Sequence, residues 1–328
     1  MRAIIHGTSM DNLISLYQQR LNLHNATFSR IDHDDTMVAV VYKVTLPEPV
    51  GTQLIRLRQN IPRLRRNETT AFEPLRFILK ICTRAQDYFR EVYFLKHFAD
   101  MLPVTRIIQV VQPETGMYGA VLMECLPGAL LEKKDLTDAL AYEIGSLLAR
   151  IHLNRVSGYG DLTQPDELVQ DPRVYFALKF EESFAECSNH LPKALLEKCY
   201  RYYETHLNLL DSVDGPCMIH RDFRAGNIIV HNGKLQGIID WASGRAGFAQ
   251  EDFIPMEHAG WPTNATSKKS FLAGYASIRL VPDYSAMIPI LRMGRAFATI
   301  GCTVKYETWE SLNARAYQFN RHFLETFF

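Results

Sequence analysis

The stretch 217–241 constrains the fold of this 328-residue chain more than any other segment. It holds two apolar runs separated by Asn-Gly at 232–233, and this dipeptide between such runs is typical of a β-hairpin with a type I′ turn. A two-residue turn there places Asn227 opposite Ile238. Opposed residues, and residues two apart along a strand, share one face of a sheet. Asn227 and Asp240 are therefore expected to project from the same face.

Three oxygen-bearing side chains are thereby predicted to lie near the open end of this hairpin. Asp222 comes in the loop just before it, and Asn227 and Asp240 belong to the hairpin segment. Carboxylate and amide oxygens are the ligands that Mg²⁺ prefers. A carboxylate that does not bind metal can accept a proton from an attacking hydroxyl. The segment therefore indicates a site for Mg²⁺ and a nucleotide, with a chemical base beside it.

The composition argues against several classes of function. Hydrophobic residues make up 47% of the chain and charged residues 22%, which are ordinary values for a soluble globular protein and not for a disordered one. Lys plus Arg and Asp plus Glu both number 36, whereas a dedicated nucleic-acid binder usually has a basic excess. No apolar run approaches the roughly 20 residues of a membrane span. We therefore expect neither a nucleic-acid nor a membrane partner.

The cysteines and the N-terminus indicate the compartment. The six cysteines form no C-x-x-C pair, so neither a zinc site nor a thioredoxin-like pair is indicated. Several lie in apolar runs, where a reduced thiol packs as a small hydrophobic group. The N-terminal segment lacks the sustained apolar core of a signal peptide. A cytoplasmic protein is expected from these features.

Hydrophobic periodicity divides the chain into a sheet-rich part and a helical part. The first part is predicted to hold helices over 9–21 and 86–98 and strands over 26–31, 37–46, 77–82, 106–111 and 119–124. Leu126-Pro127-Gly128 then breaks the chain. Beyond it, helices are predicted over 135–152, 174–187, 192–210, 268–278, 286–304 and 309–326. The fold class is expected to be α+β, with an N-terminal lobe at 1–125 and a C-terminal lobe at 126–328.

The order of these features resembles the catalytic core of the aminoglycoside phosphotransferase and choline kinase-like superfamily, relatives of the eukaryotic protein kinases. The motifs are His220-Arg221-Asp222 with Asn227, and Ile239-Asp240-Trp241, and the resemblance extends over roughly residues 26–255. It implies a bilobal protein kinase-like fold. The small antiparallel-sheet N-lobe would bind the nucleotide, and the larger helical C-lobe would carry catalysis and substrate binding.

The resemblance also implies roles for individual residues and two cofactors, ATP and Mg²⁺. Asp222 corresponds to the catalytic base, and His220 orders the catalytic loop. Asn227 and Asp240 correspond to the residues that hold Mg²⁺. Asp252 matches a position that braces the catalytic loop.

A strand lysine and a helix glutamate complete the family pattern. Lys80 lies on the predicted strand 77–82, and Glu91 shares one face of the predicted helix with the apolar residues Tyr88 and Leu95. An inward-facing carboxylate needs a charged partner, and Lys80 is the natural one. The resemblance implies that this pair holds Lys80 against the α- and β-phosphates of ATP. The alternative is that Lys80 lies on a solvated face of its strand.

Three further segments carry weaker signals. The run 121–128 resembles the family's hinge, where backbone groups near Glu124 and Leu126 would meet adenine; the alternative is an ordinary strand end. The loop expected to cover the phosphates, at 33–36, has no glycine and carries two acids, which repel a triphosphate unless they turn outward. The arginine-rich stretch 56–66 is interpreted as a solvated insertion rather than an anion site.

Together these features predict an ATP- and Mg²⁺-dependent phosphotransferase that acts on a hydroxyl of a small molecule such as an aminoglycoside, an amino alcohol or a sugar. One alternative is a catalytically weak nucleotide-binding regulatory protein on the same fold. A protein kinase is the third, and the short segment after Asp240 disfavours it. The five polar residues of the pattern favour the first: Lys80, Glu91, Asp222, Asn227 and Asp240.

The distribution of charge bears on the acceptor, which the resemblance places between two helical parts of the C-lobe. Residues 153–219 carry six basic and eleven acidic side chains, and residues 241–328 carry nine basic and seven acidic ones. A polycationic aminoglycoside would require acidic side chains on both walls. Only one wall has an acidic excess, around Glu181, Glu182 and Glu186. We therefore expect an acceptor with little or no positive charge, although those acids could also simply face water.

Overall fold

The computed structural model describes residues 10–31, 39–47, 74–258, 261 and 265–328. The expected phosphate-covering loop at 33–36 and the arginine-rich stretch 56–66 lie outside these ranges. The described chain forms two compact units. The first unit contains the residues up to Ala129 together with 229–231 and 236–242, and the second contains the rest.

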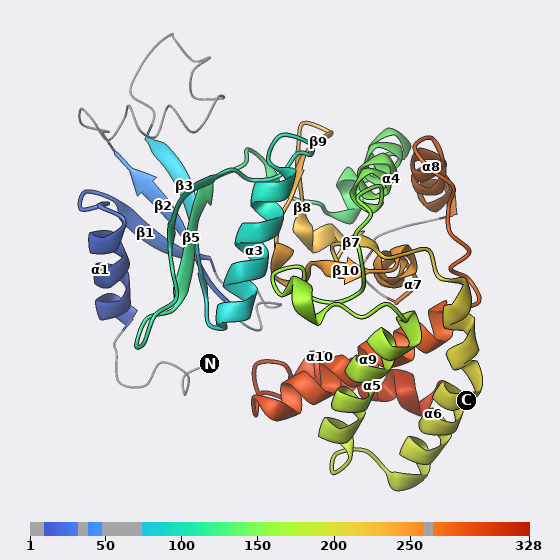
Figure 1. The fold of residues 1–328 in the computed structure, drawn as a ribbon. Helices are drawn as coiled ribbons and strands as arrows, with labels where there is room; N and C mark the ends of the chain where they lie inside the picture. The colour runs from blue at the N-terminus through green and yellow to red at the C-terminus, as the bar shows by residue number, and fades with distance from the viewer. Residues whose placement is uncertain (1–9, 32–38, 48–73, 259–260, 262–264) are drawn as a thin grey trace. The chain divides into compact units, whose positions relative to one another are not determined.

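The first unit is built on a five-stranded antiparallel sheet, with α1 (Met10–Arg20) and α3 (Ala85–Phe98) flanking it (Figure 1). The strand order is β1-β2-β3-β5-β4. The strands are β1 (Thr27–Ile31), β2 (Ala39–Leu46), β3 (Leu75–Cys82), β4 (Ile107–Val111) and β5 (Gly119–Glu124). This arrangement confirms the antiparallel N-terminal sheet that the family resemblance implies.

Strand alternation decides which side chains reach the functional side of this sheet. Leu79 and Ile81 of β3 are fully buried and belong to one core cluster with Tyr17 of α1. Each such buried apolar side chain stabilises the fold by about 1.5–3 kcal/mol. Because successive side chains of a strand point to opposite faces, Lys80 projects away from this core cluster. It therefore emerges on the side of α3.

Helix α3 also anchors a distant piece of the chain. The indole ring of Trp241 stacks on Phe94, with ring centroids 5.4 Å apart, and lies 5.0 Å from the ring of Phe98. The backbone N–H of Ile238 donates to the carbonyl of Pro103 at a distance of 3.0 Å. Segment 236–242 is thus attached to the first unit, and Asp240 with it.

The predicted hairpin is confirmed. Strands β8 (Ile228–His231) and β9 (Lys234–Ile238) are joined by Asn232 and Gly233, whose φ angles of 51° and 70° fit a type I′ turn. The short strand β6 (Ala129–Leu130) completes a three-stranded sheet in the order β6-β8-β9. Asn227 ends a single 3₁₀ turn, Ala225–Asn227, just before β8.

The second unit is mainly helical, and a short antiparallel pair of strands, β7 (Cys217–Ile219) and β10 (Arg245–Gly247), lies within it. Helices α4 and α8 approach closely, since a Cβ on Gly145 would stand 1.9 Å from the carbonyl oxygen of Phe271. The helices are α4 (Asp138–His152), α5 (Pro172–Cys187), α6 (Lys193–His206), α7 (Ile254–His258), α8 (Ala265–Ala276), α9 (Ile288–Lys305) and α10 (Ala314–Glu325). Among the described helices, none is both long and apolar enough to cross a bilayer.

Candidate functional site

The loop between β7 and β8 is held by one buried carboxylate. Asp252, in the 3₁₀ segment Ala249–Phe253, accepts hydrogen bonds from the backbone N–H groups of His220 (2.8 Å) and Arg221 (2.5 Å). Its Oδ2 also lies 3.1 Å from Nε2 of His152. Asp252 thus braces the loop, in agreement with the position that it matches in the resemblance.

A buried imidazole completes this brace. His152 of α4 lies with Nδ1 2.8 Å from the hydroxyl of Tyr275 and with Nε2 facing Asp252. Burial lowers the pKa of His152, although Asp252 opposes the effect, so the ring is neutral at physiological pH. The geometry fits an Nε2–H that donates to Asp252 and an Nδ1 that accepts from Tyr275. Every polar group of this buried network has a partner, which rigidifies the loop.

His220 is also fully buried. Its Nδ1 accepts a hydrogen bond from the backbone N–H of Asp222 at 3.3 Å, which places its proton on Nε2 when the ring is neutral. The contact is to the backbone of the predicted base and not to its carboxylate. This geometry fits a supporting role for His220.

The carboxylate of Asp222 lies between two guanidinium groups. Its Oδ1 accepts from Nη2 of Arg295 (2.8 Å), and its Oδ2 accepts from Nε of Arg224 (3.0 Å). Burial would raise the pKa of Asp222, but Arg295 and Arg224 outweigh it and hold that pKa well below its usual range. Asp222 is therefore ionised throughout the physiological range.

Asn227 is tied to the same carboxylate. Its Nδ2 donates both to the backbone carbonyl of Asp222 (2.9 Å) and to Oδ2 of that residue (2.8 Å). These two bonds use the amide nitrogen and direct the amide oxygen away from Asp222. The structure thus brings Asp222 and the buried Asn227 together.

In the first unit, Lys80 bridges two carboxylates. Its Nζ lies 2.7 Å from Oε2 of Glu91 and 2.7 Å from Oδ1 of Asp240. The Lys80 and Glu91 side chains are 9% and 2% exposed, whereas that of Asp240 is 43% exposed. Burial would lower the pKa of Lys80, but Asp240 and Glu91 outweigh it and raise that pKa. The ammonium therefore remains charged, and the predicted Lys80–Glu91 pair is present.

Two of the residues beside these charges have strained backbones. Arg221 and Asp240 both have a φ of 65°, in the left-handed region that residues other than glycine seldom adopt. Such conformations persist where the surrounding structure enforces them, and they cluster at functional sites. Asp252 holds the backbone at Arg221, and the packing of Trp241 fixes the segment that contains Asp240.

Comparison with known proteins identifies the family. The model of the phosphotransferase enzyme family matches residues 59–290, which is more than half of the chain. The chain belongs to this phosphotransferase enzyme family. No curated protein matches its sequence significantly.

Solved structures share the fold of this phosphotransferase. It is similar to the aminoglycoside phosphotransferase APH(4)-Ia in a ternary complex with AMP-PNP and hygromycin B, with a TM-score of 0.63 and 13% identity over 91% of this chain and 93% of that one. It is similar to ADP-bound APH(2'')-Ib, with a TM-score of 0.60 and 15% identity over 97% and 99%. The gentamicin complex of APH(2'')-IIa gives a TM-score of 0.61 and 15% identity over 96% of each chain. These likenesses confirm the protein kinase-like fold class.

The predicted hinge residues of the phosphotransferase lie in its first unit. Glu124 ends β5, where it pairs with Phe77 of β3, and its backbone N–H donates to the carbonyl of Arg106 at 2.9 Å. Leu126 follows the strand and is buried. Their contact with adenine stays a prediction.

Each unit of the phosphotransferase carries one oxygen donor of the kind that Mg²⁺ prefers. The first unit has the half-exposed carboxylate of Asp240, and the second has the amide oxygen of Asn227. Mg²⁺ takes one or two such protein oxygens and keeps several waters. Within the described ranges, no three His, Cys, Asp or Glu side chains gather into an all-protein metal site. Either donor is therefore of a kind that could hold a metal ion bound to phosphate oxygens, and a metal site stays a prediction.

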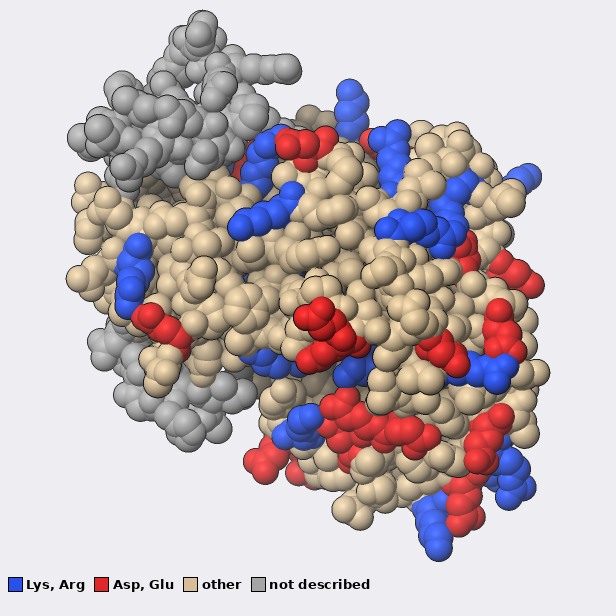
Figure 2. Space-filling model, viewed as in Figure 1, with Lys and Arg blue, Asp and Glu red and all other residues tan. Residues whose placement is uncertain are grey.

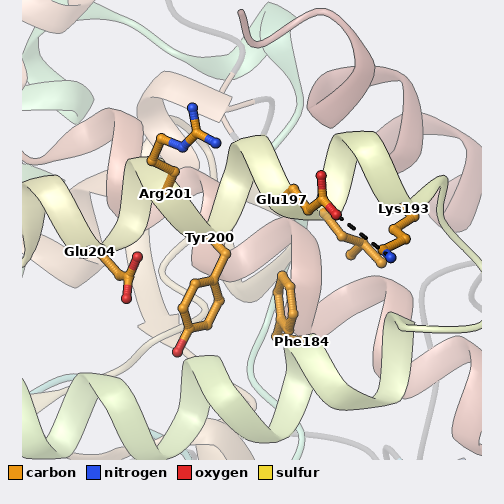
Figure 3. A pocket seen from close by; sticks show the side chains of 7 residues that line it. Phe184, Lys193, Glu197, Tyr200, Arg201 and Glu204 are labelled. Atoms are coloured by element: carbon orange, nitrogen blue, oxygen red, sulfur yellow. Dashed lines mark ion pairs between the residues drawn. The ribbon is translucent and has the colours of Figure 1, made fainter.

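A pocket of about 510 Å³ lies elsewhere in the second unit, along α6 (Figure 3). Tyr200 and Phe184 form its apolar part, and Lys193 and Glu197 are paired at its end. None of the predicted site residues lines it. This pocket is therefore separate from the loop that carries Asp222.

Sequence analysis did not identify Arg224 and Arg295 as part of the site. Arg224 lies only two residues after Asp222, so its proximity could have been read from the sequence. Arg295 is 73 residues away on α9 and carries no comparable signal.

Proposed function

We propose that this phosphotransferase transfers the γ-phosphate of ATP to a hydroxyl of a small molecule in a Mg²⁺-dependent reaction. The observation that carries the proposal is the position of Lys80 between Glu91 and Asp240, which lie 11 and 160 residues away in sequence. A buried, permanently charged lysine with a fixed carboxylate partner is suited to bind phosphate oxygens. The loop that contains Asp222 and Asn227 supplies the remaining polar groups.

Each predicted residue has a role in this proposal. Lys80, held by Glu91, pairs with the α- and β-phosphates, and backbone groups near Glu124 and Leu126 meet adenine. Asn227 and Asp240 would hold Mg²⁺, which when bound neutralises charge on the phosphate oxygens.

Asp222 acts on the acceptor. As the acceptor oxygen bonds to the γ-phosphorus, its O–H bond breaks and the proton passes to the Asp222 carboxylate, while ADP departs with the electrons of the broken P–O bond. A carboxylate of low pKa is a weak base, so it orients the hydroxyl and takes the proton late in this step. His220 keeps the backbone of Asp222 in position.

Similar structures support the nucleotide and the class of acceptor. The related proteins are described as complexes with AMP-PNP and hygromycin B, with ADP, and with gentamicin. These are properties of those proteins, and they make a nucleotide and a hydroxylated small molecule the first ligands to test here.

The contacts of the acidic residues support an acceptor that is not polycationic. Glu182 lies 2.7 Å from Lys179 and Glu186 lies 2.8 Å from Lys305, so both carboxylates already have cationic partners. Glu181 accepts from the hydroxyl of Tyr200 at 3.0 Å. On the face drawn in Figure 2, acidic and basic side chains lie beside one another over the helical unit. Two of these three carboxylates are therefore already neutralised by lysines and are less available to a cationic aminoglycoside.

The test is a phosphotransfer assay with ATP, Mg²⁺ and a panel of aminoglycosides, choline, sugars, nucleosides and a generic protein. We expect ADP formation that depends on a small hydroxylated acceptor and disappears in Asp222→Asn. Phosphorylation of the protein substrate alone would show a protein kinase instead. Binding of Mg²⁺–ATP without transfer to any acceptor would show a nucleotide-binding regulatory protein.

A further inference from the structure

The hydrogen bonds to the carboxylate of Asp222 distinguish its two oxygens. A carboxylate has about four lone-pair positions for hydrogen bonds, two on each oxygen. Oδ2 accepts two hydrogen bonds, from Nδ2 of Asn227 (2.8 Å) and from Nε of Arg224 (3.0 Å). Oδ1 accepts one, from Nη2 of Arg295 at 2.8 Å. Among the donors that the described residues supply, these three use both positions on Oδ2 and one position on Oδ1.

Arg295 differs from the other two donors in where it lies. Arg224 and Asn227 follow Asp222 in the same loop, so both move with that loop. Arg295 is 73 residues away on α9. Met293 and Ala296, on either side of it, are fully buried and hold this helix in the core. Arg295 therefore fixes the Asp222 carboxylate against a part of the fold that is independent of the loop.

The same guanidinium also holds the backbone just before Asp222. Its Nη1 donates to the carbonyl of Arg221 at 3.1 Å, while Nη2 donates to Oδ1 of Asp222. On the other side of Arg221, the backbone N–H donates to Asp252 at 2.5 Å. A guanidinium is planar and rigid, so its two bonds fix the loop backbone and the carboxylate relative to each other. This matters at Arg221, whose φ of 65° needs such support.

We propose that Arg295 is a positioning residue that directs Oδ1 of Asp222 to the acceptor, so that Oδ1 is the atom that takes the hydroxyl proton. The inference rests on the proposed function, because it assumes that Asp222 is the base. The Asp222 side chain is 21% exposed, so an acceptor hydroxyl has access to it.

Only the proton changes place at Asp222 in this step. The acceptor oxygen bonds to the γ-phosphorus, its O–H bond breaks, and the proton passes to the second lone pair of Oδ1. ADP departs with the electrons of the broken P–O bond. The first lone pair of Oδ1 keeps its bond to Arg295, which stays protonated throughout. Arg295 thus acts on the reaction through Asp222 and does not itself exchange a proton.

A double-mutant cycle between Arg295 and Asp222 tests the inference, with radiolabelled ATP and each member of the acceptor panel that the full-length wild type phosphorylates. Arg295→Gln should lower kcat about 10-fold or more, because a hydrogen bond to a charged group is lost. The KM for the acceptor and the Kd for ATP should stay within a few-fold of wild type. In the Asp222→Asn background the same substitution should change kcat by less than about 2-fold, since the oriented carboxylate is already absent.

Two further variants make the cycle decisive. Arg292→Gln is the matched control, because Arg292 lies on the same helix but its guanidinium stands 4.4 Å from the ring centroid of Phe323. It should keep the kcat of its parent in both backgrounds. Arg295→Lys retains the charge without the planar fork and should keep part of kcat. If Arg295→Gln fails to fold, as judged by its Tm and circular dichroism, Arg295→Lys takes its place in the cycle.

The outcomes separate this inference from the proposed function. An equal fall of kcat in both backgrounds would overturn the inference, since Arg295 would then act independently of the Asp222 carboxylate. A kcat that does not fall in Arg295→Gln would overturn it too, as would a rise in the acceptor KM alone, which would indicate direct binding of the acceptor. If the wild type phosphorylates no member of the panel, the proposed function fails, and the inference fails with it.

Discussion

Lys80 and Glu91 form a buried ion pair, with 2.7 Å between Nζ and Oε2, on a strand and a helix of the first unit. Neither side chain has access to bulk water that could replace its partner. Removing one member of such a pair leaves a buried charge uncompensated, which costs more than the pair itself contributes. The pair therefore fixes α3 against β3 and holds the lysine that the proposed reaction requires.

Glu91→Ala should lower the free energy of unfolding by about 3–5 kcal/mol, because Lys80 then keeps only Asp240 as a partner. Urea denaturation of wild type and variant measures the difference. Glu114→Ala is the control, since its ion pair with Arg20 is 52% exposed on both sides and such pairs contribute only about 0–1 kcal/mol. Equal losses in the two variants would contradict the assignment of Glu91 as a buried partner.

Asp222→Asn should lower kcat by about 10²- to 10⁴-fold and leave the Kd for ATP within a few-fold of wild type. In the proposed reaction, the acceptor hydroxyl loses its proton acceptor, whereas the nucleotide would contact Lys80 and the metal instead. Steady-state kinetics and a nucleotide titration give the two quantities. Undiminished turnover in the variant would remove Asp222 from the proposed reaction.

Asp240→Asn should lose Mg²⁺-dependent nucleotide binding and activity together. Asparagine tolerates the left-handed φ of 65° at this position, so the loss reports the missing charge and not a strained backbone. Titration of the variant with ATP at several Mg²⁺ concentrations measures the effect. If the Mg²⁺ dependence matched that of the wild type, Asp240 could not be a metal ligand.

The pH profile tests the two arginines beside Asp222. The pKa of the Asp222 carboxyl is lower in the folded protein than its unfolded value of about 3.9. The ion pairs of Asp222 with Arg295 and Arg224 therefore stabilise the fold above about pH 3.9, and this stabilisation is lost as the pH falls through the folded pKa. The wild type should accordingly show no acid limb from Asp222 above about pH 4. Arg295→Gln raises the pKa of Asp222, because burial is then opposed mainly by Arg224. We expect an acid limb in log kcat at higher pH than in Arg292→Gln, and coincident profiles would contradict this.

Some parts of the fold and site were predictable because the residues themselves, with their nearest neighbours in the sequence, favour a single local structure. The Asn232-Gly233 pair accepts positive φ at both positions, which is what the turn requires. Glu91 lies on an apolar helix face, and its carboxylate needed a cation within reach. Both features follow from the residues and their nearest neighbours.

Other parts depend on contacts that the sequence does not display. On α9, Arg295 and Arg292 have the same appearance in the sequence, and only the fold brings one of them to Asp222. Strand β10 has three residues, too few for an alternating pattern. The predicted helix 309–326 begins only at Ala314, because Asn313 donates through its Nδ2 to the hydroxyl of Thr308 at 2.9 Å and holds a turn there.

The two ion pairs of Lys80 bear on how neutral and charged ligands would differ in binding to this enzyme. In the proposed binding mode, an uncharged purine analogue that occupies only the adenine position leaves Lys80 with both of its carboxylates. In the same mode, a triphosphate must share the ammonium with Asp240, whose bond to Nζ is 2.7 Å long. Neutral compounds therefore avoid an electrostatic rearrangement that the nucleotide has to undergo. Their affinity should respond little to ionic strength, whereas that of the nucleotide should weaken as salt rises.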